Sequence, residues 1–267
     1  MAAGLLVLGP ARAAQAQSVQ LHGPPMPKGT VVEAVSVFTL EADGAYGDET
    51  VPISRVSRTV SRSEVVRADA RAVRAVRQIV LADTTWERFA DEPLTVEVGV
   101  LQGLAVKSER GASGRWTLRA DGWTPTEAQA AALAETGVES GEELPHKAVQ
   151  VGETVEVPRA VIARVYDGLV PDEPAWMAVR LDSVGVQAGH PVAYLSEAAV
   201  VTVSLDGGAW MEMDMTAQVI RRLDVDLPVR VAWEGEVWIA GLDVEMEIAG
   251  WMTIVEDYAV VDGSLVP

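Results

Sequence analysis

The chain of 267 residues contains no cysteine and no asparagine. Without cysteine it has neither a disulfide framework nor a thiol nucleophile. Lysine is also scarce, since Lys28, Lys107 and Lys147 are the only lysines among 21 bases. Together with abundant Ala, Val, Arg and Gly, these gaps are typical of GC-rich coding. They reflect an evolutionary bias and carry no functional information.

Positive charge is in short supply, because 39 acids face 21 bases and the formal net charge is −18. Nucleic-acid binding needs clustered Lys and Arg that release counterions from phosphates, so this balance argues against it. The same balance disfavours binding to anionic membrane surfaces. An acidic surface favours a protein that stays in solution.

Long apolar runs are missing too, and no stretch approaches the 18 residues of a membrane-spanning helix. A short apolar run over residues 2–8 is followed by two small-x-small sites, Ala-Arg-Ala and Ala-Gln-Ala, at residues 11–16. These features predict a secretory signal over residues 1–16. The positively charged start of such a signal is missing, and a truncated or misassigned start would explain its absence. A short flexible tail is the alternative. We therefore expect a secreted or periplasmic protein.

The sequence signatures of enzymes are absent. The chain has no G-x-S-x-G elbow, no phosphate-binding G-x-x-x-x-G-K, no dinucleotide glycine pattern and no H-E-x-x-H. Its three histidines, His22, His146 and His190, are scattered without metal-ligand spacing. We predict a protein that is not an enzyme and that has no metal site and no cofactor.

Pairs of carboxylates leave one catalytic alternative open. Asp224 lies two residues from Asp226, and Asp43 lies near Asp48 and Glu49. Paired carboxylates can bind calcium or hydrolyse glycosidic bonds, so a hydrolase with an acidic site is an alternative. With 39 acids in the chain such pairs also arise by chance, and solvated loop charges are the favoured interpretation.

The first half of the chain is expected to be β-rich. Residues 17–29 are rich in Pro and Gly, which predicts a mobile leader with His22 at its surface. Residues 30–143 follow as the N-terminal β-rich half, and they begin with a strand-like run of valines. Residues 63–82 fit either a helix or a hairpin, and their valine content favours strands.

One helix stands out over residues 124–137. Thr124 is its predicted N-cap, Pro125 its first residue, and Glu127 completes a capping box. Gly137 suits its C-terminal end. The next stretch, residues 144–158, is interpreted as a structural joint in which Gly152 supplies backbone freedom, and a short helix is expected over residues 159–166.

Residues 144–267 contain the clearest pattern of the sequence, in which apolar and polar residues alternate with a period of two. Such alternation predicts half-buried strands with one face toward a core. Five long strands are expected, at about residues 175–186, 191–205, 209–223, 227–240 and 242–256, with a turn at Ala240-Gly241. We predict a mainly β fold in which this antiparallel meander forms a curved sheet, half-barrel or barrel. One or two short helices accompany it, and the first half joins it in one continuous domain.

Methionine and tryptophan gather in this meander. One set shares the apolar parity and could line a cavity for a lipid or another apolar molecule: Met211, Met213, Met215, Trp233, Met246 and Met252. Simple filling of a sheet core explains the same pattern and is favoured. Trp210, Trp238 and Trp251 lie on the polar parity, where they either lie beneath a helix or mark a partner surface.

The middle of the chain carries a motif. Asp121-Gly122 through Glu127 begin the predicted helix, and the pattern LPxxxVxVG[DE]T follows. Its residues are Leu144-Pro145, Val149 and Val151-Gly152-Glu153-Thr154. In these residues, and in the layout of residues 30–260, the chain resembles a family of uncharacterised secreted bacterial proteins, although Val155 stands where that family usually has Trp. The resemblance implies an exported, mainly β protein with no established activity, so no catalytic residue carries over.

These observations lead to one functional hypothesis and two alternatives. We expect a secreted, non-enzymatic β-rich protein of the bacterial envelope that binds an apolar ligand, such as a lipid, or another envelope component. The first alternative is a structural or adaptor module that pairs through the edge of its sheet. The second is the hydrolase with an acidic site. The sequence leaves the oligomeric state open.

Overall fold

The computed structural model describes most of the chain from Ser18 onward. The described ranges are 18–46, 48–111, 116–135, 144, 147–166, 169–170, 173–205, 208–241, 246–262 and 265. Within these ranges, 12 strands form one antiparallel sheet, two more form a small sheet, and two short helices accompany them. The predicted mainly β class is therefore confirmed. The signal predicted over residues 1–16 and His146 lie outside the described residues.

The large sheet is built from strands of very different length. Its strands are β2 (Val31–Tyr46), β3 (Glu49–Ala68), β4 (Val73–Phe89), β5 (Thr95–Val98), β6 (Ala105–Arg110), β7 (Trp116–Ala120), β9 (Thr154–Glu156), β10 (Trp176–Gln187), β11 (His190–Ser204), β12 (Ala209–Arg222), β13 (Leu227–Gly241) and β14 (Glu247–Val261). The small sheet pairs β1 (Ser18–Val19) with β8 (Val149–Gln150). The helices are α1 (Glu127–Glu135) and α2 (Arg159–Val165).

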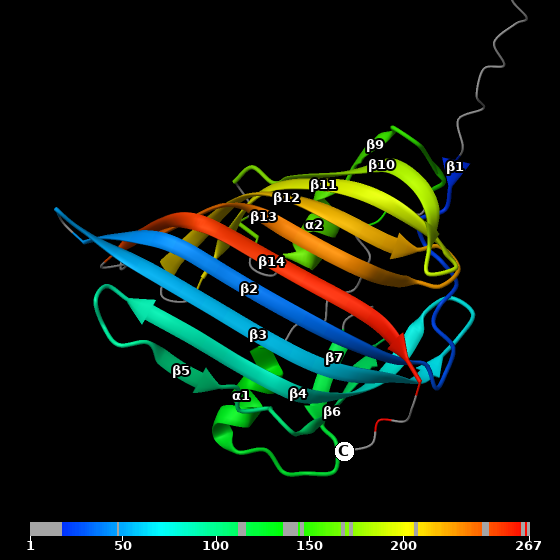
Figure 1. The fold of residues 1–267 in the computed structure, drawn as a ribbon, viewed down its shortest axis with the longest axis horizontal. Helices are drawn as coiled ribbons and strands as arrows, with labels where there is room; N and C mark the ends of the chain where they lie inside the picture. The colour runs from blue at the N-terminus through cyan, green and yellow to red at the C-terminus, as the bar shows by residue number, and fades with distance from the viewer. Residues whose placement is uncertain are drawn as a thin grey trace, which may run out of the picture.

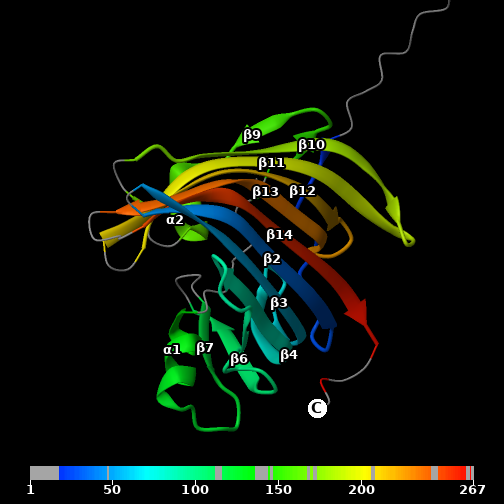
Figure 2. The same ribbon diagram turned by 60° about the vertical axis from the view of Figure 1, so that its left-hand side comes forward.

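The sheet is open and strongly curved. Its strands follow the order β7-β6-β4-β3-β2-β14-β13-β12-β11-β10-β9, with β5 paired to β4. β2 pairs with β14 from Val31 opposite Val261 to Ala45 opposite Glu247, so the two halves of the chain share one sheet. Long antiparallel strands accumulate twist, and Figures 1 and 2 show the resulting half-barrel. Of the predicted forms, the closed barrel is wrong, because β7 and β9 are two separate edges.

The predicted meander corresponds to β10–β14. The first four strands agree within two residues at each end, because strict alternation marks them clearly. The predicted turn at Ala240-Gly241 is wrong. Both residues belong to β13, where Gly241 pairs with Ala209, so β13 continues further than expected. The fifth strand begins at Glu247, and residues 242–245 lie outside the described residues.

Residues 63–82 form a hairpin, as their valine content favoured. β3 ends at Ala68 and β4 begins at Val73. The carboxylate of Asp69 holds the turn by accepting hydrogen bonds from the amides of Arg71 and Ala72, at 2.8 and 3.0 Å. A hydrogen bond from Arg74 and these two amides lower the pKa of Asp69 to about 2.

The helix predicted over residues 124–137 begins later than expected, since α1 spans Glu127–Glu135. Thr126 and Gln129 make the reciprocal capping bonds that were assigned to Thr124 and Glu127. The Thr126 amide donates to Gln129 Oε1 at 2.9 Å, and the Gln129 amide donates to Thr126 Oγ1 at 3.3 Å. The sequence offered two overlapping capping boxes, and the later one is used. Gly137 lies outside the described residues.

The joint predicted over residues 144–158 contributes β8 and β9, and the short helix after it is α2. Gly152 has a φ of 86°, so the backbone freedom expected there is used. Neither α1 nor α2 is long and apolar enough to cross a membrane, and no other helix occurs in the described part of the chain.

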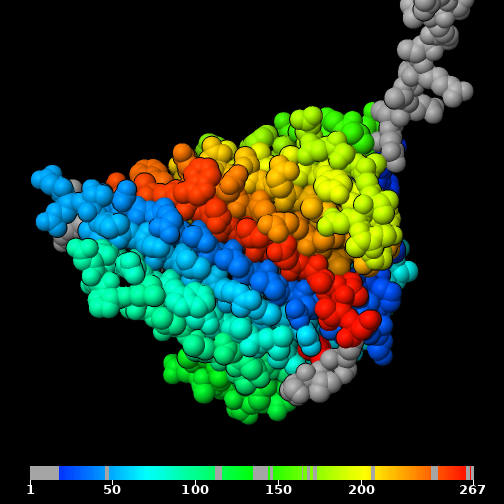
Figure 3. Space-filling model, viewed as in Figure 1, coloured from blue at the N-terminus to red at the C-terminus, as the bar shows by residue number. Residues whose placement is uncertain are grey.

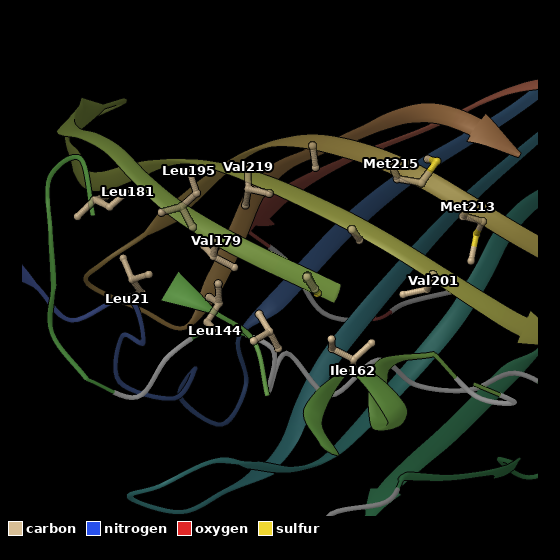
Figure 4. Packing of buried hydrophobic residues seen from close by; sticks show 14 of the residues in the cluster. Leu21, Leu144, Ile162, Val179, Leu181, Leu195, Val201, Met213, Met215 and Val219 are labelled. Carbon is tan, nitrogen blue, oxygen red and sulfur yellow. The ribbon is translucent and has the colours of Figure 1, made fainter. Parts of the chain in front are cut away.

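The core lies on the concave side of the sheet, which is called the inner face below. Inner side chains of β10–β13 pack against Ile162 of α2 and against Leu21 and Leu144, which are 1%, 0% and 3% exposed. Figure 4 shows these three side chains approaching Val179, Leu195 and their neighbours from the concave side. The core is therefore closed by segments that come from outside the sheet.

The leader was expected to be mobile, and the structure instead holds residues 18–29 against the sheet. Leu21 is fully buried, and the Asp226 amide donates to the Pro24 carbonyl at 2.8 Å. His22, expected at the surface, has its Nε2 3.0 Å from the Leu144 carbonyl. A single buried leucine in a Pro-rich segment is too weak a local signal to reveal this docking.

Candidate functional site

The inner and outer faces of the meander have opposite chemistry. On β12, inner residues such as Met213, Met215 and Ala217 are buried, whereas Glu212, Asp214 and Thr216 between them are exposed. The same split continues across β13 and β14, because residues paired directly across an antiparallel ladder share a face. Two candidate binding surfaces follow, one on each face.

The predicted methionine set is largely brought together on the inner face. Met213, Met215 and Met252 are 6%, 3% and 7% exposed within one core cluster. Met211 and Trp233 are partly buried against this cluster. Met246 is not part of it. Its sulfur lies where a side chain on Gly44 would begin, at the far end of β2.

The apolar inner surface extends further than its cover. α2 lies against β10, and the docked leader reaches the ends of β12 and β13. Beyond them, a row of large apolar side chains on β2, β13 and β14 is only partly buried: Phe38, Leu40, Val231, Trp233, Ile239 and Ile254. Direct pairing of Trp233 with Ile254 and of Ile254 with Phe38 makes this row continuous. We call it the apolar strip.

The inner face becomes polar where β2 meets β3. Phe38 pairs with Ser57, whose hydroxyl lies 3.0 Å from that of Thr85 on β4. Two residues further along β3, the Thr59 hydroxyl donates a hydrogen bond of 3.2 Å to Asp83 Oδ1 of β4. Sequence reasoning missed this polar strip, although Ser and Thr recur with a period of two over residues 57–63. One concave face therefore offers an apolar surface with a hydroxyl-rich border.

Two carboxylates also lie on the inner face. Glu197 of β11 is 7% exposed and sits opposite Val179 and Ala217. Glu256 of β14 accepts a hydrogen bond of 2.6 Å from the Tyr258 hydroxyl. Alternation alone does not reveal either residue, because each occupies a position that the pattern assigns to an apolar side chain.

The outer face carries the three predicted tryptophans. Trp210 and Trp238 are in edge-to-face contact, with ring centroids 4.6 Å apart. Trp238 and Trp251 are 38% and 47% exposed. They do not lie beneath α2, because α2 packs on the inner side. Figure 3 shows this outer face, on which β14, β2 and β3 run side by side.

Carboxylates surround these rings. Glu212 is paired with Trp238, and Trp251 is flanked by Glu236 on β13 and Glu41 on β2. Asp214 and Glu236 even stand directly opposite each other. Like charges in that position are destabilising unless something compensates them.

The carboxylate pair proposed for a hydrolase is split between two ion clusters. Asp224 accepts two hydrogen bonds of 2.8 Å from Arg222 and lies 2.9 Å from His190 Nδ1. The bonds from Arg222, together with His190, hold the pKa of Asp224 far below its usual range. Neutral carboxyl groups are needed for general-acid catalysis, so this arrangement does not favour it.

The second acid of that pair, Asp226, points to a different cluster, formed by Arg221 and His22. Burial raises the pKa of Asp226, but the nearby His22 and the charge of Arg221 outweigh burial and lower it. Asp43, Asp48 and Glu49 are exposed around the β2–β3 hairpin. Among the described residues no cluster of three or more acids and histidines could hold a metal ion.

The fold and its surfaces define an open, curved antiparallel sheet with a half-covered apolar concave face. No protein-family model and no curated protein matches the chain. A lipovitellin structure titled for lipid–protein interactions is similar over 90% of this chain, with a TM-score of 0.47 and 6% identity, and the chain spans 26% of its length. DynF, from the dynemicin biosynthesis pathway of Micromonospora chersina, matches with a TM-score of 0.23 and 8% identity, over 96% of this chain and 88% of DynF. Likenesses this weak support no inference about function, which must come from the surfaces themselves.

Proposed function

We propose that the protein is a non-enzymatic carrier of a lipid-like amphipathic molecule, bound on the inner face of the sheet. The apolar strip is the observation that supports this proposal. It is continuous with the buried core, and it is left partly exposed on a concave surface. Concave, mostly apolar surfaces with a few polar groups are the usual form of small-molecule sites.

The polar strip gives the ligand an orientation. An acyl chain would lie along Trp233, Ile254 and Phe38, and its polar head would reach the hydroxyls of Ser57 and Thr59. Covering about 300 Å² of apolar surface contributes about 7 kcal/mol, which corresponds to micromolar affinity before losses from ordering. A ligand with one apolar and one hydrogen-bonding end therefore fits better than a pure hydrocarbon.

Lipid extraction from the purified protein tests this proposal. We expect an amphipathic lipid in native mass spectra of the full chain produced in a bacterial host. Trp233→Ser should abolish it, whereas Trp251→Ser, the same change on the outer face of the neighbouring strand, should leave it bound. Ile254→Trp fills the concave surface without creating a void, and should also expel the ligand. A wild-type protein that is free of lipid and binds none from micelles would contradict the proposal.

We further propose that the protein works outside the cytoplasm. The small-x-small sites at residues 11–16 and the resemblance to secreted bacterial proteins support export. Cleavage after residue 16 would leave Ser18, the first residue of β1, in place. N-terminal sequencing of protein recovered from the periplasm should give a start at residue 14 or 17. Recovery of only the uncleaved chain from the cytoplasm would contradict export.

The outer tryptophans favour a second candidate function, binding of another envelope protein. Exposed Trp residues concentrate binding energy at interfaces, and Trp238 and Trp251 lie among carboxylates that suit a basic partner. Crosslinking in the envelope should capture a partner with the wild type and lose it with Trp238→Ser. Retention of the same partner by this variant would exclude the surface.

One feature supports the adaptor alternative. β9 pairs only with Ala178 to Arg180 of β10, so the described part of the chain leaves the β10 edge uncovered from Ser183 to Gln187. Val186 on this edge is 73% exposed. Val186 pairs with Pro191 of β11, whose carbonyl accepts from Leu223 of β12, so the Val186 N–H points to the free edge. Val186→Pro would block strand addition there, because proline cannot donate a ladder hydrogen bond. A partner that binds this variant unchanged does not use the edge.

A further inference from the structure

A cavity of about 540 Å³ lies at the other end of the sheet, between the ends of β3, β4, β6 and β7. None of its lining residues belongs to the core cluster of the inner face. The lining consists of Val66, Arg67, Ala75, Arg77, Lys107, Glu109 and Asp121. This cavity is therefore separate from the apolar strip.

Three cations stand in one row across neighbouring strands at this cavity. Arg77 of β4 pairs with Lys107 of β6, and Lys107 pairs with Arg119 of β7, which lies just outside the lining. Directly paired residues share a face and bring their side chains within about 5 Å, so like charges there are destabilising. Two such contacts in succession call for compensating negative charge.

A fourth cation is brought in by a β-bulge. The register of β3 and β4 shifts between Val65 and Arg67, so that Arg67 and not Val66 pairs with Ala75. The bulge thus turns Arg67 onto the face of Ala75, Glu109 and Arg77. Bulges commonly re-aim a side chain at a binding site. Ala75, which is 2% exposed, forms a small floor between the longer side chains and leaves the space above it open.

The carboxylates present neutralise most, but not all, of this charge. Asp121 accepts a 2.6 Å hydrogen bond from Arg77 Nε. Glu109 lies 3.1 Å from Lys107 Nζ and is also paired with Arg119, and these cations lower its pKa. Within the described chain the Arg67 guanidinium makes no direct side-chain hydrogen bond, and its charge acts on Glu109 from a distance. Glu64 of β3 stands directly opposite Arg77. Four cations against three carboxylates leave one positive charge in excess.

The positive excess at this cavity is opposite in sign to the net charge of the whole protein. Residues 49–120 carry 12 bases and 9 acids, whereas residues 176–261 carry 4 bases and 14 acids. In a chain with a net charge of −18, a cavity with surplus cations is a local arrangement and not an average property. Its donors also have the geometry for oxyanions, because guanidinium groups bind phosphate oxygens in pairs and lysine acts as a point charge.

We propose that this cavity binds the phosphoryl group of a small anionic ligand. An anion compensates the excess charge, and the paired donors of two guanidinium groups suit the several oxygens of a phosphoryl group. Arg67 and the two free Nη groups of Arg77 donate to the phosphoryl oxygens, and Lys107 adds its charge. The phosphoryl group comes either from a soluble phosphate ester or from a lipid headgroup.

Calorimetric titration of the full chain at low ionic strength tests the site with glycerol 3-phosphate and inorganic phosphate as probes. Arg67→Gln should weaken binding about tenfold, as expected for the loss of one charge-assisted contact. Arg58→Gln is the matched control, since Arg58 is an exposed arginine of the same strand, outside the cavity and without a described ion pair. It removes the same charge and should change affinity less than twofold.

Two further measurements distinguish the sources of the phosphoryl group. Binding of glycerol 3-phosphate without binding to vesicles that contain phosphatidic acid assigns a soluble ester. Vesicle binding lost in Arg67→Gln assigns a lipid headgroup. No heat with either soluble probe and no vesicle binding would overturn the proposal, and so would equal weakening by Arg67→Gln and Arg58→Gln. Neither result depends on whether lipid is extracted from the inner face.

Discussion

The two wings belong to one antiparallel sheet but carry different chemistry. The acidic wing, β10–β14, is apolar on its inner face and bears carboxylates and tryptophans outside. The basic wing, β3–β7, has hydroxyls on its inner face and a row of cations near its end. Alternation decides only which side chains share a face. The residue types on each face decide where the core forms and what each wing can bind.

The largest expected difference between the wings is in stability. Leu195 of β11 is fully buried on the inner face, whereas Ser57 of β3 is half-buried on the same face. Leu195→Ala should lower the free energy of unfolding by about 3 kcal/mol, because it leaves a cavity in the core. Ser57→Ala removes one hydrogen bond and should lower it by about 1 kcal/mol or less. Urea denaturation measures both, and equal losses would show that the wings share one uniform core.

Close packing within the acidic wing is tested by glycine replacement. A side chain on Gly235 of β13 would begin 2.0 Å from the Asp214 carbonyl oxygen, which is backbone and cannot move aside. Gly235→Ala should therefore cost about 2 kcal/mol. A side chain on Gly185 of β10 would contact only the Tyr194 ring, at 3.3 Å. Gly185→Ala should therefore lower the free energy of unfolding by less than about 1 kcal/mol. Thermal unfolding ranks the two, and the reverse order would contradict this packing.

The contrast between the wings also explains what the sequence could predict. β10–β13 were located closely because their alternation is local and strict over many residues. The β2–β14 pairing and the docking of Leu21 join residues far apart in sequence, and no local pattern specifies such contacts. The capping of α1 was misplaced because two overlapping motifs were equally good.

For the candidate sites the outcome is similar. Five of the six predicted ligand residues lie together because alternation places them on the same face of the sheet. Met246 precedes the first residue of β14 and lies apart from them. The polar strip had a visible signal in its Ser and Thr period. The cation row at the cavity had no visible sequence signal, because it depends on the register of β4, β6 and β7 and on one bulge.

Docking of the leader should make the acidic wing sensitive to pH. The carboxylate of Asp226, 3.7 Å from His22 Nδ1, raises the pKa of His22 above 6.5, and the pKa of Asp226 is lowered below 3.8. The His22 contribution is complete below about pH 6.5 and is lost as pH rises through the raised pKa. The Asp226 contribution is present above about pH 3.8 and is lost as pH falls through the lowered pKa. Both operate together between these values.

His22→Gln should therefore lower the Tm by about 3 °C at pH 5.5, as for the loss of one ion pair that contributes about 1 kcal/mol. At pH 9, where His22 is neutral, the variant and the wild type should differ by less than about 1 °C. His190→Gln is the control, since that ring lies in the exposed Asp224 cluster. A Tm difference that is independent of pH would show that His22 contributes by packing alone.

The smallest expected effect has opposite signs on the two wings. Asp214→Asn removes one of two carboxylates that face each other across β12 and β13, and should stabilise the protein by about 0.5 kcal/mol. Asp121→Asn removes the partner of Arg77 beside the cation row, and should destabilise it by a similar amount. Raising the salt concentration to 1 M should shrink both differences, since the screening length falls to about 3 Å. Unfolding curves at low and high salt check this. If Asp214→Asn destabilised the protein, the outer carboxylates would have to be held by contacts within the chain, and a basic partner would no longer be needed to explain them.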